Sequence, residues 1–225
     1  MKYLLSILFL LLSQAACQTT PGQPGKDLDY LAKTDIDTIS DIHVQRMEAL
    51  LRRLTEKLYR RNPGQCQGGT PAIRTCVHRV FDDEAPKPDL AGKRGTASIQ
   101  LAFDEDYEGD RVLALMFGLR TMLRAAYGEK REFFITDELD PQKLYNSARN
   151  IEITVWRLSH YQQPDGQLYL VSNELEGEVK NLSYERLFGK LISLQDTMAV
   201  IIAESSQRNI KNMIQRLATA VFLPI

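Results

Sequence analysis

The chain is poor in the residue types from which reactive centres are usually built. It has three cysteines, three histidines and one tryptophan in 225 residues. His43, His78 and His160 stand far apart in the sequence, so a metal site or a catalytic triad would need the fold to bring them together. The sequence also lacks a Gly-x-Ser-x-Gly elbow, a Ser-x-x-Lys set, a His-Glu-x-x-His motif and a phosphate-binding glycine loop. We therefore predict no catalytic residue, no metal ligand and no cofactor.

The sequence also has little net charge and few long apolar runs. The 28 basic and 29 acidic side chains give a formal net charge of −1, which provides no electrostatic footprint for nucleic acid or for anionic lipid surfaces. Beyond the first 16 residues, no stretch approaches the roughly 18 apolar residues of a membrane-spanning helix. The hydrophobic content of 44% is ordinary for a globular protein. We expect a single folded domain, over residues 35–225, that is large enough for a real core.

The first 17 residues are the most informative part of the sequence. Lys2 gives a basic start, and an apolar run from Leu4 to Leu12 follows it. The small residues Ala15 and Ala16 then stand directly before Cys17. This order is typical of a secretory signal, and the apolar run is too short to span a bilayer comfortably.

The segment Leu12-Ser13-Gln14-Ala15-Ala16-Cys17 resembles the lipobox of bacterial lipoproteins, with Gln14 where the most typical lipoboxes carry an aliphatic residue. The resemblance implies removal of the signal peptide 1–16, lipidation of Cys17 and attachment to a cell-envelope membrane on its periplasmic side. Gln18 follows the cysteine where aspartate would favour the inner membrane, so the sorting rule of enteric bacteria favours the outer membrane. The alternative is an ordinary signal peptide with an incidental cysteine. Residues 17–34 are rich in Pro, Gly and Thr, and we interpret them as a tether.

Residues 65–94 contain many glycines and prolines and few apolar residues, which predicts a long loop. Because the lipid would occupy Cys17, Cys66 and Cys76 remain as an even pair in an oxidising compartment. We predict that they form a disulfide, which would contribute about 2–3 kcal/mol of stability. The alternative is a metal site made by Cys66, Cys76 and His78, which lacks an obvious fourth ligand.

Apolar residues recur at intervals of three and four in four stretches, which predicts four amphipathic helices. They cover residues 36–58, 112–126, 144–158 and 187–221. The last would be about 50 Å long, with a bend or break in the polar patch 204–209. Ser183 is expected to cap it. Gly118, inside the second, suggests the close approach of a neighbouring helix.

Three features mark the boundaries of the other helices. Asn62-Pro63-Gly64 is predicted to end the first, Gly128 to close the second, and Asp140-Pro141 to begin the third. The acidic run 104–106 is interpreted as the start of the second helix, with a cation site as the alternative.

The remaining apolar segments are short. Alternating residues in 97–103 predict a strand, and 133–135 and 168–171 are brief apolar runs. We expect a mainly α fold, a bundle of about four helices with a disulfide-bearing loop and a few short strands. The alternative is an α+β fold with a small sheet.

Three functions are compatible with this sequence. We favour an interaction or accessory module that contacts another envelope protein, with Ile210, Ile214 and Leu217 as the partner-binding stripe. The alternatives are an enzyme that modifies the envelope, with its site in the disulfide-bearing loop, and a carrier of an apolar ligand. A large apolar pocket with convergent polar groups would favour the alternatives, and a filled core with one exposed apolar patch would favour the module.

The lipobox resemblance leads to a direct test. We expect the wild-type protein to incorporate radiolabelled palmitate and to fractionate with membranes, because Cys17 would carry the acyl chains. Cys17→Ser should abolish the labelling and leave an unanchored or unprocessed form. A soluble, unlabelled wild-type protein would show that the segment is not a lipobox.

Overall fold

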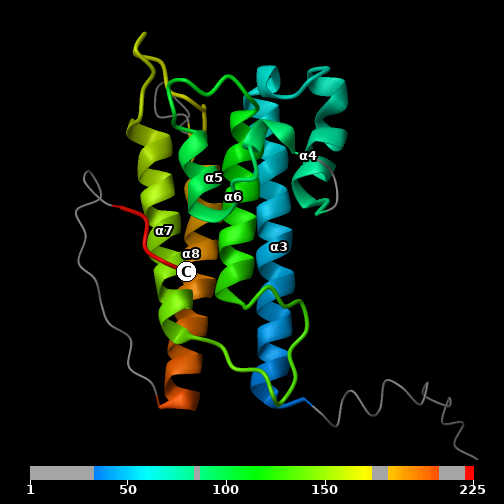
Figure 1. The fold of residues 1–225 in the computed structure, drawn as a ribbon, viewed down its shortest axis with the longest axis vertical. Coiled ribbons are helices and arrows are strands. Elements are labelled where there is room, and N and C mark those ends of the chain that lie inside the picture. The colour runs from blue at the N-terminus through cyan, green and yellow to red at the C-terminus, as the bar shows by residue number, and fades with distance from the viewer. Residues whose placement is uncertain (1–32, 84–86, 174–181, 208–220) are drawn as a thin grey trace, which may run out of the picture.

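A computed structural model describes residues 33–83, 87–173, 182–207 and 221–225. Within these residues the chain forms six α-helices, and the main ones lie side by side as a bundle (Figure 1). The prediction of a mainly α fold is confirmed. Cys17 and the stripe formed by Ile210, Ile214 and Leu217 lie outside the described residues.

Four long helices form the body of the molecule. They pack in a ring in which each contacts the next, and they run alternately up and down (Figure 1). This is the up-down-up-down arrangement of a four-helix bundle. The four helices are α3 (Asp35–Arg61), α6 (Arg111–Ala126), α7 (Pro141–His160) and α8 (Ser183–Ser206).

The connection between α3 and α6 carries the smaller elements. Helix α4 (Ile73–Phe81) packs beside α3 and α6, and α5 (Gly95–Leu101) packs along α6. Three short 3₁₀ helices, η1 (Pro63–Gln65), η2 (Thr70–Ala72) and η3 (Pro88–Leu90), join them.

The core of the bundle is filled by the apolar stripes expected from the sequence. Each long helix contributes side chains that are almost fully buried, and α6 is buried on nearly every face because α3, α4, α5 and α7 surround it. Representative core residues are Met47, Leu51, Leu54, Leu115, Met116, Leu119, Leu144, Ile151, Leu191 and Met198.

The expected helix boundaries are largely confirmed. Helix α3 ends at Asn62, and Asp140 caps α7 by accepting a hydrogen bond from the Gln142 backbone N–H at 2.9 Å. Gly128 follows the end of α6 with φ +64°, in the left-handed region that glycine adopts readily. The cap of α6 is Asp110, rather than the run 104–106 that precedes it by a turn.

Gly118 is the point at which α5 meets α6 most closely. A Cβ atom at this position would lie 2.7 Å from the backbone nitrogen of Ile99 and 2.8 Å from the carbonyl oxygen of Gly95. Only glycine allows this distance, so the predicted close approach of a neighbouring helix is confirmed.

The strand predicted over residues 97–103 is wrong, because most of this segment is α5. Ile99, Leu101 and Phe103 alternate with other residues, which resembles a strand pattern. However, Ser98 and Ala102 are buried as well, and together with Ile99 they form a helical face. The Ser98 hydroxyl donates to the Ala114 carbonyl at 2.8 Å, which allows a polar side chain in the core. The described residues contain no strand, only an isolated bridge between Gln162 and Leu168.

Helix α8 ends at Ser206, inside the patch 204–209 where a bend or break was expected, and Gln207 has φ +53°. Its 24 residues correspond to about 36 Å. Ser183 is the first helical residue and not the cap, because Leu182 occupies the cap position without a side-chain hydrogen bond.

The end of the chain is not helical and lies on α7. The side chain of Asn150 exchanges two hydrogen bonds with the backbone of Leu223, at 2.8 and 2.6 Å. Asn146 donates to the Pro224 carbonyl at 2.8 Å. These buried amides fix the position of residues 221–225. The expected continuation of the last helix over 208–220 lies outside the described residues.

The disulfide between Cys66 and Cys76 is confirmed, which excludes the metal site at these cysteines. The surrounding segment is more ordered than the loop predicted for residues 65–94. Cys76 lies within α4, where Ile73, Val77 and Val80 are buried. The apolar spacing of this nine-residue helix is real, but frequent glycines and prolines on either side obscured it in the sequence.

Two glycine substitutions test the packing of α5 on α6. Gly118→Ala should lower the free energy of unfolding by about 2 kcal/mol, because the new methyl group would overlap with the α5 backbone. Gly189→Ala, in α8, is the matched control, since a Cβ there meets no atom within 4 Å. It should raise the free energy of unfolding by about 0.5–1 kcal/mol through helix propensity. Urea unfolding measures both, and equal effects of the two substitutions would contradict this packing.

Candidate functional site

The structure keeps the three histidines apart. His43 is on α3, His78 on α4 and His160 at the end of α7, where its ring stacks on Trp156 with the ring centres 4.6 Å apart. Among the described residues, no three His, Cys, Asp or Glu side chains gather closely enough to hold a metal ion. These positions therefore supply no triad and no metal site.

Three aspartates close to helix ends and turns shape the local backbone. Asp104 accepts a hydrogen bond from the Asp106 backbone N–H at 3.1 Å. Asp137 accepts from the Phe134 backbone N–H at 3.0 Å and pairs with Lys130. Asp140 is the cap of α7. These contacts assign turn and cap roles to the three carboxylates.

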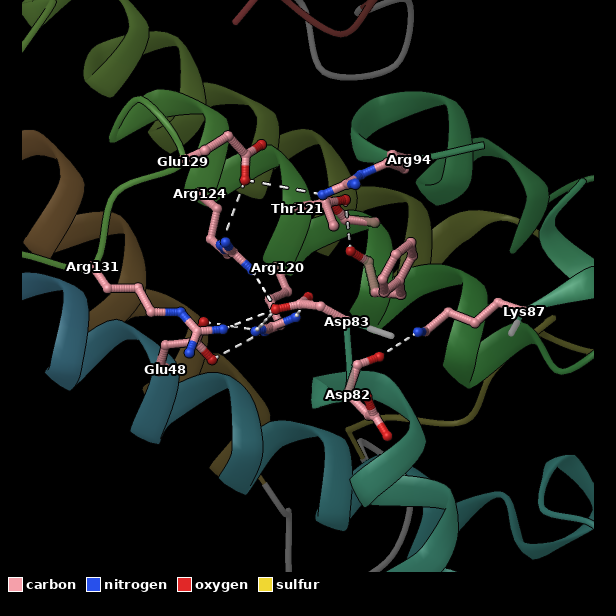
Figure 2. Close-up of polar contacts among 12 residues, drawn as sticks. Glu48, Asp82, Asp83, Lys87, Arg94, Arg120, Thr121, Arg124, Glu129 and Arg131 are labelled. Carbon is pink, nitrogen blue, oxygen red and sulfur yellow. Dashed lines mark hydrogen bonds and ion pairs between the residues drawn. The ribbon is translucent and has the colours of Figure 1, made fainter. Parts of the chain in front are cut away.

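The most extensive polar cluster surrounds Arg120, a buried arginine of α6 (Figure 2). Its Nε donates to both carboxylate oxygens of Glu48 on α3, each at 3.1 Å, and its Nη1 donates to Asp83 at 2.6 Å. Asp83, just after α4, also pairs with Arg124 at 2.7 Å and Arg131 at 2.8 Å. One carboxylate thus receives three guanidinium groups from two parts of the chain.

The charged groups of this cluster stabilise one another's ionised forms. The hydrogen bond from Arg120, reinforced by Arg124, holds the pKa of Asp83 far below its ordinary value despite partial burial. Burial disfavours the charge on Arg120, but its contacts with Asp83 and Glu48 outweigh that cost and raise its pKa. The charged groups of Arg120, Glu48 and Asp83 are already engaged with one another, so we interpret the cluster as structural.

The sequence interpretation overlooked Arg120. The signal was an arginine placed between Leu119 and Met122, inside the strongest apolar helix of the chain. A charged residue at such a position needs a partner when the helix is buried.

The disulfide forms one wall of a cleft of about 450 Å³, which Asp110 also lines. Tyr59 donates its hydroxyl hydrogen to Asp110 Oδ2 at 2.7 Å, and the Leu113 backbone N–H donates to Oδ1 at 2.8 Å. Burial raises the pKa of Asp110 to about 6, against the opposing effect of these hydrogen bonds. On the same wall, Gln65 accepts from the Arg111 backbone N–H at 2.7 Å.

This cleft has one feature of a catalytic site, a carboxyl group whose pKa lies near neutrality. Both oxygens of Asp110, however, already accept hydrogen bonds from groups of the fold, and burial raises the pKa of Tyr59 far above its ordinary value. The remaining charged pair, Arg79 and Asp89, is joined at 3.2 Å. The arrangement therefore caps α6 and holds the disulfide segment against it.

A groove on the outside of the bundle differs from these sites because none of its charged side chains has an ion-pair partner in the part of the chain that the structure describes. It lies between α3 and α8 and has a volume of about 740 Å³. Leu50, Leu194 and small residues form its floor, and basic side chains from both helices stand along it. The lining residues are Arg46, Ala49, Leu50, Arg53, Arg186, Gly189, Lys190, Ser193 and Leu194.

None of the four basic side chains of this α3–α8 groove forms an ion pair within the described part of the chain, and no acidic residue is among the lining residues. A groove of similar size, about 760 Å³, lies between α3 and α4. There Arg60 pairs with Glu56 at 2.5 Å and Arg52 lies over the Phe81 ring at 4.1 Å. Arg74, which also lines that groove, has no ion pair within the described residues. The α3–α8 groove differs in that none of its four cations has such a partner and no acidic residue lines it.

The sequence pattern indicated only two of the four basic residues of this groove. Arg46 and Arg53 were visible as part of the polar side of the first helix. Arg186 and Lys190 were not singled out, because only the packing of α8 beside α3 brings them to the same groove. Residues more than 130 positions apart in the chain give no local pattern.

The raised pKa of Asp110 predicts a pH-dependent stability. Between pH about 4 and 6 the folded chain retains a proton on Asp110 that the unfolded chain has lost, so wild-type stability should fall as the pH rises through this range. Asp110→Asn keeps the cap and removes the titration. The stability of the wild type minus that of the variant, from urea unfolding, should decrease on the order of 2–3 kcal/mol between pH 4 and 7. A difference that is independent of pH would contradict the burial of this carboxyl.

Comparison of the chain with protein-family models, with curated proteins and with solved structures finds no match. No helix among the described residues has both the length and the apolar character needed to cross a membrane. The observations that bear on function are therefore the first 17 residues, the fold and the unpaired surface charge.

Proposed function

We propose that the protein is a lipid-anchored lipoprotein of the cell envelope that acts by contact, as an interaction or accessory module for another envelope component. The observation that carries the proposal is the contrast between the interior and the surface. The bundle is filled by apolar side chains and closed polar networks, whereas the α3–α8 groove presents an apolar floor and four cations without an ion-pair partner among the described residues.

The anchor and the location are parts of the same proposal. Cys17 follows a signal of the lipoprotein type, and residues 18–34 give the domain a linker of low apolar content. The Cys66–Cys76 disulfide is in keeping with an oxidising compartment such as the periplasm. Gln18 favours the outer membrane.

The same contrast argues against the two alternatives. An envelope-modifying enzyme would need a nucleophile or a general base that can reach a substrate, but the carboxyl of Asp110 is engaged with the fold. A carrier would need an apolar cavity, whereas the interior positions of the four long helices are packed against one another. Contact with a partner requires neither feature.

The proposed contact surface includes the C-terminal stripe of Ile210, Ile214 and Leu217. Their three-to-four spacing suits one face of a helix that docks into a partner. Helix α8 ends at Ser206 and Leu223 is attached to α7, and the stripe between them lies outside the described residues. Partner binding and core packing are therefore tested by separate measurements.

Ile214→Asp and Leu217→Asp test this surface. Each should reduce capture of the partner at least about tenfold, because a charge in an apolar contact is costly, and should leave the melting temperature within about 2 °C. Capture is measured by in-cell cross-linking of the membrane-anchored protein, followed by quantitative mass spectrometry.

Asn212→Asp is the matched control, since it adds the same charge to the same segment outside the stripe. Unfolding by Ile214→Asp or Leu217→Asp would instead place the stripe in the core. Turnover of an envelope substrate by the purified protein, without a captured partner, would refute the proposal of a contact function.

A further inference from the structure

We infer that the α3–α8 groove receives an acidic amphipathic helix of a partner protein. This inference rests on the proposed contact function and adds the chemical class of the partner element. It concerns a second surface, distinct from the C-terminal stripe, on residues that the structure describes.

Charge is the first reason. Arg46 and Arg53 approach the groove from α3, and Arg186 and Lys190 approach it from α8. All four residues are exposed, and none has an ion-pair partner in the described part of the chain. The whole protein has a formal net charge of −1, so this concentration of positive charge is local and favours an anionic occupant.

The spacing of these cations favours an elongated occupant. Tyr184 donates its hydroxyl hydrogen to the Lys57 carbonyl, which fixes the antiparallel register of α3 and α8. In this register Arg53 lies near the level of Arg186, whereas Arg46 is about 10 Å further along α3. One lipid phosphate can reach only one end of such a row. A helix lying in the groove can present carboxylates to both rims and at several levels.

The floor of the groove permits close approach by a helix backbone. Gly189 lies in the middle of α8, where glycine costs about 1 kcal/mol relative to alanine, yet a Cβ there would meet no atom within 4 Å. No contact within the described chain therefore accounts for this glycine, in contrast to Gly118. Ala49 and Ser193, also small, line the same groove.

The groove leads towards two exposed apolar residues. Ile42 is 49% exposed and lies one turn before Arg46 on α3, and Val200 is 56% exposed and lies two turns beyond Ser193 on α8. Because the helices are antiparallel, both residues lie beyond the same end of the groove. A docked helix longer than the basic part could therefore continue over apolar surface.

The shape and the charge exclude two other occupants. A bilayer is a broad surface, which is poorly matched to a concave groove between two helices. The chain's own residues 208–220 contain Arg208, Lys211 and Arg216 and no acidic residue, so their charge repels the groove. An acidic helix from another protein matches the groove in shape and is opposite to it in charge.

A designed peptide tests the chemistry directly. The probe is a labelled 15-residue helix with leucines on one face and glutamates beside them, compared with the same peptide carrying lysines instead. Fluorescence anisotropy measures its binding to the full lipoprotein in phosphatidylcholine nanodiscs. We expect the acidic peptide to bind at least about tenfold more tightly than the lysine peptide, and the preference to shrink as salt is added.

Two variants assign the binding to the groove. The double variant Arg53→Glu with Lys190→Glu should reverse the preference between the peptides. Gly189→Leu should weaken binding of the acidic peptide at least about tenfold, because the leucine side chain would fill the groove. It should not lower the melting temperature of the protein, because this side chain would lie outside the core. The control, Arg74→Glu with Lys143→Glu, changes the same charge on exposed residues elsewhere and should leave binding unchanged.

Equal affinity for the two peptides, or a groove variant that binds as the wild type does, would overturn the inference. So would binding to phosphatidylglycerol vesicles that depends on Arg53 and Lys190 when the acidic peptide does not bind.

The native occupant is identified with a photo-crosslinking residue at Ser193, in cells that contain the anchored protein. An adduct with an acidic amphipathic segment of another protein supports the inference if charge reversal in that segment restores cross-linking to the double variant. An adduct with lipid, with a second copy or with residues 174–181 of the same chain overturns it. Partner capture that does not depend on the groove would refute the inference and leave the contact function intact.

Discussion

Arg120 carries a guanidinium group buried inside the bundle, and the two carboxylates that compensate its charge constrain the rest of the fold. Its side chain is 3% exposed, and it takes Glu48 from α3 and Asp83 from the segment after α4. Removal of one partner of a buried pair costs about 3–5 kcal/mol, because a buried charge is left without compensation. Helices α3, α4 and α6 are therefore held in a single arrangement.

The ion pairs around Arg120 also fix the segments that connect the long helices. Asp83 also receives Arg124 and Arg131, so the segment that connects α6 to α7 is tied to the end of α4. On the opposite side of α6, Gly118 allows α5 to approach at a distance that no other residue permits. Charge and packing thus fix α6 from two sides, and the small helices are structural parts of the bundle.

The sequence predicted the long elements of this fold because their signals are local and repeated. Apolar spacing located α3, α6 and α7 together with most of their ends, and the even pair of cysteines predicted the disulfide. The prediction failed where a short segment takes its structure from its neighbours. In α5 the buried Ser98 was read as polar, although the Ala114 carbonyl satisfies its hydroxyl. The end of the chain is set by Asn150, whose contact with Leu223 spans 73 positions.

The same reasoning explains why a contact function is difficult to read from a sequence. Catalysis requires particular chemical groups at particular distances, and many such sets leave motifs. Docking of a helix requires only that two surfaces match in charge and depth, and here four cations from two distant helices provide the charge. Inside the bundle, the carboxylates of Glu48 and Asp83 compensate the buried charge of Arg120. We therefore propose that the surface cations of the α3–α8 groove, which stand over an apolar floor and beside a glycine with open space above it, mark the part of the molecule that contacts a partner.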